Sequence, residues 1–301
     1  MIKPPPSLDP PALADWVEYS ALTTPAGISR ADVTRSLEGA GVDDNDEVNS
    51  LLGDISRHIT DRRFWLRQKY PLRVTRLSFE RKNDWRSYLA YMFLLSCTMT
   101  HHYGELSMSK ARSKEPAEIF GFIARDVLGR YLDGQAVRFD APRRAPLPTQ
   151  FGKALDYLQT CTLERSGGGA ITTGREKDDG LDVVAWKSLG DGRPGQVVIL
   201  GQCAIGKNWE GKLSDLNNEL WAKHLRWHVK PLRAMLVPFH FYVGDIDLQQ
   251  QLWERHSTIA GIFFDRLRIA RWLPRNGSAE VEARAEAWCD DQLQVSQEAL
   301  T

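Results

Sequence analysis

The sequence has no excess of either charge and little cysteine. Its 301 residues hold 39 Lys plus Arg against 39 Asp plus Glu, so a nucleic-acid or membrane partner would have to bind a local patch. The four cysteines are far apart and form no C-x-x-C pair, which argues against a disulfide framework or a zinc knuckle. This cysteine usage fits a reducing cytosol.

Long apolar runs and nucleotide-binding motifs are also missing. The most apolar run, residues 88–97, is too short to cross a bilayer and predicts a buried helix. The N-terminal stretch MIKPPPSLDPP is proline-rich and does not resemble a secretion signal. No G-x-x-x-x-G-K-[ST], no G-x-G-x-x-G beside a strand and no G-x-S-x-G occurs, so nucleotide hydrolysis is not expected. The sequence predicts a soluble, cytoplasmic α/β protein.

The pattern along the chain divides into four parts. Residues 1–11 predict a disordered tail, and residues 12–114 predict a mostly helical region with an edge strand near residues 71–82. Residues 115–275 predict a core with a mixed central sheet flanked by helices, and residues 276–301 predict a C-terminal surface helix.

Within the core, the spacing of the apolar residues predicts two paired strands, four helices and one further strand. Residues 181–186 and 196–204 are rich in β-branched residues and are joined by the turn KSLGDGRPG, which predicts an antiparallel hairpin. The other predicted elements are helices at 115–134, 150–164, 208–228 (capped by Asn208) and 250–273, and a strand at 233–243.

Polar residues interrupt both strands of this hairpin. Asp182 lies among Leu181, Val183 and Val184, and Gln202 follows the run VVIL of the second strand. Alternation allows Asp182 to point to solvent, and a single buried amide is commonly a satisfied core group. The hairpin, however, brings the two side chains to the same end of paired strands. Carboxylate and amide oxygens are ligands that Mg²⁺ accepts, and a lysine beyond them could orient the attacking water.

These residues resemble the core of the PD-(D/E)XK, or restriction-endonuclease-like, nuclease superfamily. The resemblance covers residues 115–245 and rests on DDGLDVVAW, QVVILGQCA and the Lys-containing segment that follows. It implies a mixed sheet, a metal-binding Asp at Asp182, and an acidic-or-Gln position at Gln202. One departure is clear, because the family's lysine position is Ala204 here.

The resemblance also implies the remaining site residues. Lys207 or Lys212 would replace the missing lysine, and Glu118 in the first helix, or less well Glu164, would join a Mg²⁺ (or Mn²⁺) site. Asp178 and Asp179 extend the acidic cluster, either as solvated loop residues or as outer partners of the metal.

A basic segment with interleaved aromatic residues precedes the core. Residues 57–82 hold nine Lys or Arg against two acids, which fits either an ordinary basic helix or a surface that grips nucleic acid. The predicted nucleic-acid contacts are Arg62, Arg63, Arg67, Lys69, Arg73 and Arg76.

A histidine pair and the overall function complete the predictions. His224 and His228 have i, i+4 spacing, but Leu225 stands where a zinc hydrolase needs Glu, so packing is the better reading. The sequence predicts a metal-dependent nuclease (a hydrolase) acting on DNA, with RNA as an alternative substrate. The resemblance implies a restriction or antiviral defence role with a partner subunit, and a homo-oligomer is compatible with it. The alternative is a catalytically inactive protein of the same fold that binds nucleic acid or a partner protein.

Overall fold

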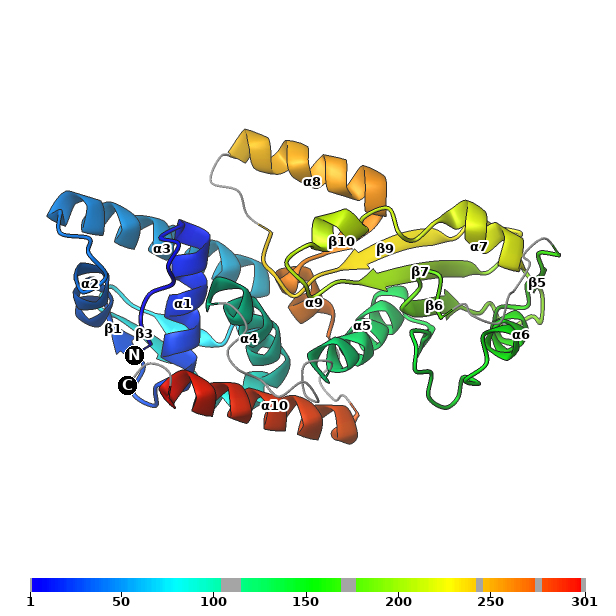
Figure 1. Cartoon of the computed structure of the whole chain (residues 1–301), viewed down its shortest axis with the longest axis horizontal. Coiled ribbons are helices and arrows are strands. Elements are labelled where there is room, and N and C mark those ends of the chain that lie inside the picture. Colours follow the sequence, from blue (N-terminus) through cyan, green and yellow to red (C-terminus); the bar gives the residue numbers. More distant parts are fainter. Residues whose placement is uncertain (1, 104–114, 169–176, 242–245, 274–277, 299–301) are drawn as a thin grey trace.

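The computed structural model describes residues 2–103, 115–168, 177–241, 246–273 and 278–298. It is a mixed α/β structure, as the sequence predicts, with ten α-helices and a central five-stranded sheet in the described residues. None of the described helices combines the length and the apolar character needed to span a membrane. Figure 1 shows the N-terminal helices on one side, the central sheet on the other, and the C-terminal helix running beneath the N-terminal helices.

The N-terminal part packs four helices around a small antiparallel sheet of order β1-β3-β2. Its elements are α1 (Pro10–Thr23), β1 (Ile28–Ser29), α2 (Arg30–Glu38), α3 (Asn45–Leu66), the 3₁₀ helix η1 (Arg67–Lys69), β2 (Leu72–Val74), β3 (Ser78–Arg81), the 3₁₀ helix η2 (Trp85–Tyr88) and α4 (Leu89–Tyr103). All but the first residue of the apolar run at 88–97 lies in α4, and it is buried from Tyr91 onward, which confirms the predicted buried helix.

The central sheet has the strand order β10-β9-β7-β6-β4. Strands β4, β6 and β7 form an antiparallel meander, whereas β9 and β10 run parallel to β7. The elements are α5 (Glu115–Leu132), β4 (Gln135–Arg138), α6 (Phe151–Thr162), β5 (Arg165–Ser166), β6 (Val183–Lys187), β7 (Val197–Cys203), η3 (Trp209–Lys212), α7 (Asn218–His224), β8 (Leu225–Arg226), β9 (Leu232–Leu236), α8 (Ile246–Ala260), β10 (Ile262–Phe264), α9 (Arg266–Trp272) and α10 (Ala279–Glu298). The predicted hairpin is confirmed as β6 and β7.

Successive residues of the hairpin pack into two different apolar clusters, one on each face of the sheet. Val183 and Ile199 point to the α5 face and join a large apolar cluster that includes Trp16 of α1 and Trp288 of α10. Val184 on the opposite face joins a smaller cluster with α6 and α7. Because the larger cluster runs from α1 to α10, the N-terminal helices, the sheet and the C-terminal helix share one apolar core.

Two helices predicted from the sequence are shorter than expected. The helix predicted at 208–228 is replaced by η3, a turn, α7 and the short strand β8, and Asn217 rather than Asn208 caps α7 through its side chain. The helix predicted at 250–273 divides into α8, β10 and α9. Gly261 ends α8 with φ +90°, and a Cβ at this position would lie 2.2 Å from the Arg233 carbonyl oxygen. Close contact with β9 therefore requires glycine there, and the chain then adds a fifth strand.

The proline-rich start of the chain is also more ordered than predicted. Helix α1 begins at Pro10, inside the predicted tail. The indole of Trp16 donates to the Ile2 carbonyl at 2.8 Å, and the Tyr103 hydroxyl donates to the Lys3 carbonyl at 2.6 Å. These bonds fix residues 2 and 3 against α1 and α4.

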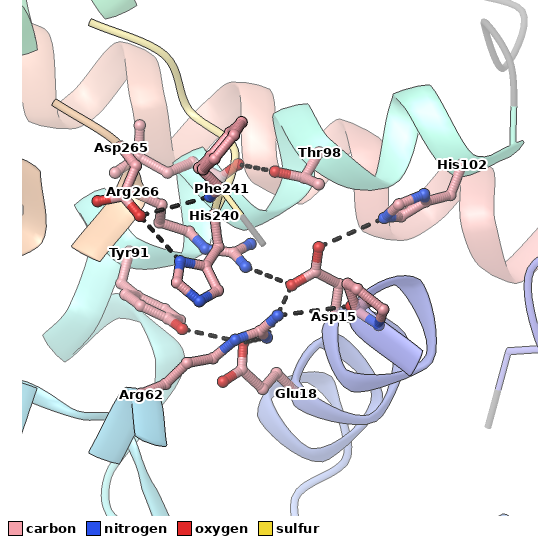
Figure 2. A network of polar contacts seen from close by, with 12 residues as sticks. Asp15, Glu18, Arg62, Tyr91, Thr98, His102, His240, Phe241, Asp265 and Arg266 are labelled. Atoms are coloured by element: carbon pink, nitrogen blue, oxygen red, sulfur yellow. Dashed lines mark hydrogen bonds and ion pairs between the residues drawn. The ribbon is translucent and has the colours of Figure 1, made fainter. Parts of the chain in front are cut away.

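A buried network of charges joins α1, α3 and α9 (Figure 2). The Arg62 guanidinium lies 2.8 Å from Asp15 and 2.8 Å from Glu18. Arg266 of α9 also pairs with Asp15. Burial disfavours the charge on Asp15, but Arg266 and Arg62 hold the pKa of this carboxyl well below its ordinary value. Tyr91 adds a hydroxyl that donates to Glu18 at 2.9 Å. Two buried anions thus neutralise two buried cations.

This network corrects the prediction for Arg62. Its side chain has no exposed surface, because it lies on the inner face of α3 between the carboxylates of α1. It is an internal counter-charge and not a contact for nucleic acid.

Candidate active site

Asp182 lies directly before β6, where the hairpin departs from regular pairing. Val183 pairs with Gly201, and the Asp182 amide also donates to the Gly201 carbonyl at 3.0 Å. Two residues thus oppose one, as in a β-bulge. The packing agrees, because Leu181 and Val184 share one apolar cluster whereas Val183 belongs to the other. The extra residue changes the direction of the Asp182 side chain from the one that regular alternation would give it at this end of the sheet.

The Asp182 carboxylate accepts a hydrogen bond from the Cys203 amide at 2.6 Å. Burial, together with the charges of nearby Asp140 and Asp178, raises the pKa of this carboxyl to about 7. The Cys203 amide and the charge of Lys212 act in the opposite direction. A half-buried carboxyl with two acidic neighbours favours a proton or a cation.

Gln202 occupies the next position on β7 and is buried, with 5% of its surface exposed. Alternation places it on the face of Leu200, and its register partner on β9 is Met235. The Asp182 carboxylate bonds the Cys203 amide and not the Gln202 side chain. In the residues that the structure describes, no three His, Cys, Asp or Glu side chains are arranged to hold a metal ion. A metal shared by Asp182 and Gln202 stays a prediction.

The two candidate lysines lie in different surroundings. Lys212, in the last turn of η3, is close enough for its charge to lower the pKa of Asp182. Burial lowers the pKa of His101 on α4, and the charge of Lys207 lowers it further, so Lys207 lies toward α4. Of the two, Lys212 is the lysine that the fold brings to Asp182.

Asp140 is a site residue that the sequence analysis missed. It follows β4, and its amide donates to the Asp182 carbonyl at 3.3 Å. Burial raises the pKa of the Asp140 carboxyl, and Asp178 raises it as well, while Arg138 lowers it through a hydrogen bond. No strand was expected at Gln135–Arg138, so the sequence pattern gave no signal for Asp140. Only the pairing of β4 with β6 shows that it lies beside Asp182.

Glu118 lies on α5 and is held by three arginines. Its carboxylate is 3.1 Å from Arg138, 2.6 Å from Arg144 and 2.8 Å from Arg284 of α10. Burial disfavours the Glu118 charge, but Arg284 and Arg138 keep its pKa below the ordinary value. Arg138 also pairs with Asp140, so it links Glu118 to the acidic residues around Asp182.

Asp178 and Asp179 have separate roles in the loop before Asp182. Asp178 accepts a hydrogen bond from the Gly180 amide at 3.2 Å, which stabilises the turn. Asp179 has φ +48°, and its carboxylate lies 2.8 Å from Nε2 of His224. Asp178 therefore contributes charge near Asp182, whereas Asp179 is paired with α7.

The histidine pair does not converge on one point. His224 ends α7, whereas His228 follows β8, and its Nδ1 lies 2.6 Å from the buried Glu164. Glu164 also accepts from the Gly195 amide at 3.2 Å. Each histidine thus has its own carboxylate, in agreement with a packing role.

The basic segment is divided by the fold. Lys69 donates to the Arg271 carbonyl at 2.6 Å and to the Leu273 carbonyl at 3.2 Å, so it caps the end of α9. The remaining predicted contacts for nucleic acid are exposed: Arg63, Arg67, Arg73 and Arg76.

No protein-family model, no curated protein and no solved structure matches this chain.

Proposed function

We propose that the chain is a metal-dependent nuclease that cleaves phosphodiester bonds of DNA at Asp182. The observation that carries this proposal is the surroundings of Asp182. It is a half-buried carboxyl with a pKa raised to about 7, two acidic neighbours and one nearby lysine. Such strongly perturbed carboxyls are typical of functional sites.

The order of elements supports the same proposal. Helix α5 precedes the antiparallel strands β4, β6 and β7, and α7 then leads to β9, which runs parallel to β7. Asp182 lies directly before the second of these four strands, and Gln202 lies in the third. This arrangement is similar to the restriction-endonuclease-like core, although a fold alone does not fix function.

Oxygen ligands at this end of the sheet fit a hard cation. Asp182 and Asp140 offer carboxylates and Gln202 an amide oxygen, the ligand types that Mg²⁺ or Mn²⁺ prefers. A bound divalent ion would lower the pKa of a water ligand and polarise the phosphate. Glu118 would join these ligands only after leaving Arg144 and Arg284.

The residues of the chain have distinct roles in this proposal. Asp182, once ionised, would hold the divalent ion through the carboxylate oxygen that does not accept the hydrogen bond of the Cys203 amide. Lys212 stabilises the negative charge that develops on the phosphate and orients the attacking water. Arg138 fixes Asp140 beside Asp182.

The second candidate is a catalytically inactive protein of this fold that binds nucleic acid or a partner protein. Ala204, buried at the position of the family's lysine, favours it. For either candidate we propose a role in bacterial defence with a partner subunit, which rests on the family resemblance alone.

Cleavage assays separate the two candidates. The purified chain is incubated with plasmid DNA and with RNA, in Mg²⁺ or in EDTA, beside Asp182→Asn. Asp191→Asn is the matched control, because Asp191 is exposed in the turn at the far end of the hairpin. We expect cleavage in Mg²⁺ that is lost in EDTA and in Asp182→Asn but kept in the control. Cleavage that survives in Asp182→Asn refutes the site, and salt-sensitive binding without cleavage selects the inactive candidate.

A further inference from the structure

Two aromatic side chains are unusually exposed at the end of α3. Phe64 and Trp65 have 67% and 59% of their surface exposed, and their ring centroids are 6.0 Å apart in an edge-to-face arrangement. The opposite face of α3 is apolar and buried, with Ile59 and Leu66 in the core. The two rings are therefore largely outside the packing of α3, and together they form an exposed apolar patch of the kind that interaction sites use.

Backbone contacts with α9 hold this end of α3 in place. Arg271 donates to the Trp65 carbonyl at 3.2 Å. Lys69, just beyond the helix, donates to the Arg271 carbonyl at 2.6 Å. The chain turns at Arg67 with φ +50°, so the helix ends directly after the two rings. Phe64 and Trp65 thus project from a fixed backbone.

A group of cations adjoins the aromatic pair through Arg63, which directly precedes Phe64 on α3. Burial lowers the pKa of Lys82, and the charges of Arg63 on α3 and Arg73 on β2 lower it further, which places these three cations close together. The Lys82 ammonium is held by the Tyr70 carbonyl at 2.8 Å. Glu80 lies 3.8 Å from Arg73 and offsets part of this charge. The surface is nevertheless positive in a chain with no net charge.

We infer that this surface is a binding site for single-stranded nucleic acid. Bases stack on Phe64 and Trp65, while Arg63 and Arg73 pair with the phosphates. Only unpaired bases present a free face to such rings, because the bases of a duplex already stack on each other. The inference names the substrate class of the proposed nuclease and so rests on the proposed function for its biological meaning.

The test is a binding measurement that needs no cleavage. Fluorescence anisotropy of a labelled oligothymidine and of a labelled DNA duplex is recorded with the full chain in EDTA. One variant combines Phe64→Ala with Trp65→Ala, and its matched control is Leu189→Ala, a side chain with 76% of its surface exposed in the hairpin turn. We expect the double variant to weaken oligothymidine binding at least about fivefold, and the control to leave it unchanged.

Charge reversal tests the phosphate contacts separately. Arg63→Glu with Arg73→Glu should weaken binding and reduce the dependence of log Kd on log salt by roughly 0.7 or more for each lost contact. Arg193→Glu, an exposed position in the hairpin turn, is the control.

Four results would overturn the inference. The first three are unchanged oligothymidine affinity in the aromatic variant, equal affinity of the parent chain for duplex and single strand, and no binding by the parent chain. The fourth is that the parent chain binds phosphatidylserine vesicles through Phe64 and Trp65 and does not bind oligothymidine. None of these results depends on Asp182. Loss of cleavage in Asp182→Asn with unchanged binding in the aromatic variant would keep the proposed nuclease and reject only this surface.

Discussion

Replacing Asp182 by asparagine should stabilise the protein at high pH. Asparagine has the same shape and keeps an oxygen that can accept from the Cys203 amide, the hydrogen bond seen at 2.6 Å. It removes only the ability to ionise. The change in stability therefore measures the cost of the charge at this position.

The pKa gives the sign and the size of the effect. The folded-state pKa of Asp182 is about 7, against an ordinary value of 3.8, so folding favours the protonated carboxyl. The associated stability is complete below pH about 4 and is lost as the pH rises through about 7. The difference corresponds to about 4 kcal/mol at full burial, and partial exposure to water reduces it to roughly 2 kcal/mol. At roughly 2–4 °C per kcal/mol, the Tm of the variant should exceed that of the parent by several degrees.

The assay is thermal unfolding of Asp182→Asn and the parent in EDTA, from pH 4.5 to pH 8.5. The variant should match the parent at pH 4.5 and be more stable at pH 8.5. Added Mg²⁺ should then stabilise the parent more than the variant at pH 8.5, because only the parent retains the carboxylate. A stability difference that does not change with pH would refute the reasoning.

Three other substitutions have clear expected outcomes. Arg62→Met should lower the free energy of chemical unfolding by about 3–5 kcal/mol, because it removes the arginine that neutralises the buried Glu18 and leaves Asp15 with Arg266. Arg63→Met at the next, exposed position should cost less than about 0.5 kcal/mol, and equal effects would contradict the buried network. Lys212→Ala should slow plasmid cleavage roughly 10²-fold or more, whereas Lys207→Ala should leave the cleavage rate unchanged. A larger loss of cleavage in Lys207→Ala would show that Lys207 is the lysine that acts at Asp182. Gly201→Ala should lower stability by about 1–3 kcal/mol, since its Cβ would lie 2.6 Å from the Leu128 side chain on α5; an unchanged Tm would show that α5 can move aside.

The parts of the fold that depend on local pattern could be predicted from the sequence. The hairpin of β6 and β7 has two runs rich in β-branched residues on either side of a clear turn, and the helix α5 has a regular apolar face that ends before Gly134. The continuous helix predicted at 250–273 is wrong, because its apolar residues fit a helix and a strand equally well. The decision depends on Gly261, whose close contact with the Arg233 carbonyl is a tertiary feature.

The site could be predicted in the same partial way. Asp182 is detectable as an acid within an apolar strand, but its direction depends on the bulge opposite Gly201, which no period-2 pattern contains. Asp140 is distant in sequence and reaches the site only through the sheet. Arg62 has the same sequence surroundings as its exposed neighbours. What distinguishes it is Asp15 on another helix, and a single sequence does not show that pairing.

The buried charges of Figure 2 also limit how this chain can be divided. Arg266 belongs to the sheet-bearing half, yet the carboxylate that neutralises it, Asp15, belongs to α1. A fragment that starts at α5 would keep a buried guanidinium and lose its counter-ion, which is more costly than the loss of an apolar contact. An exchange of N-terminal regions between related proteins would face the same requirement, since Asp15 and Arg266 would have to be transferred together.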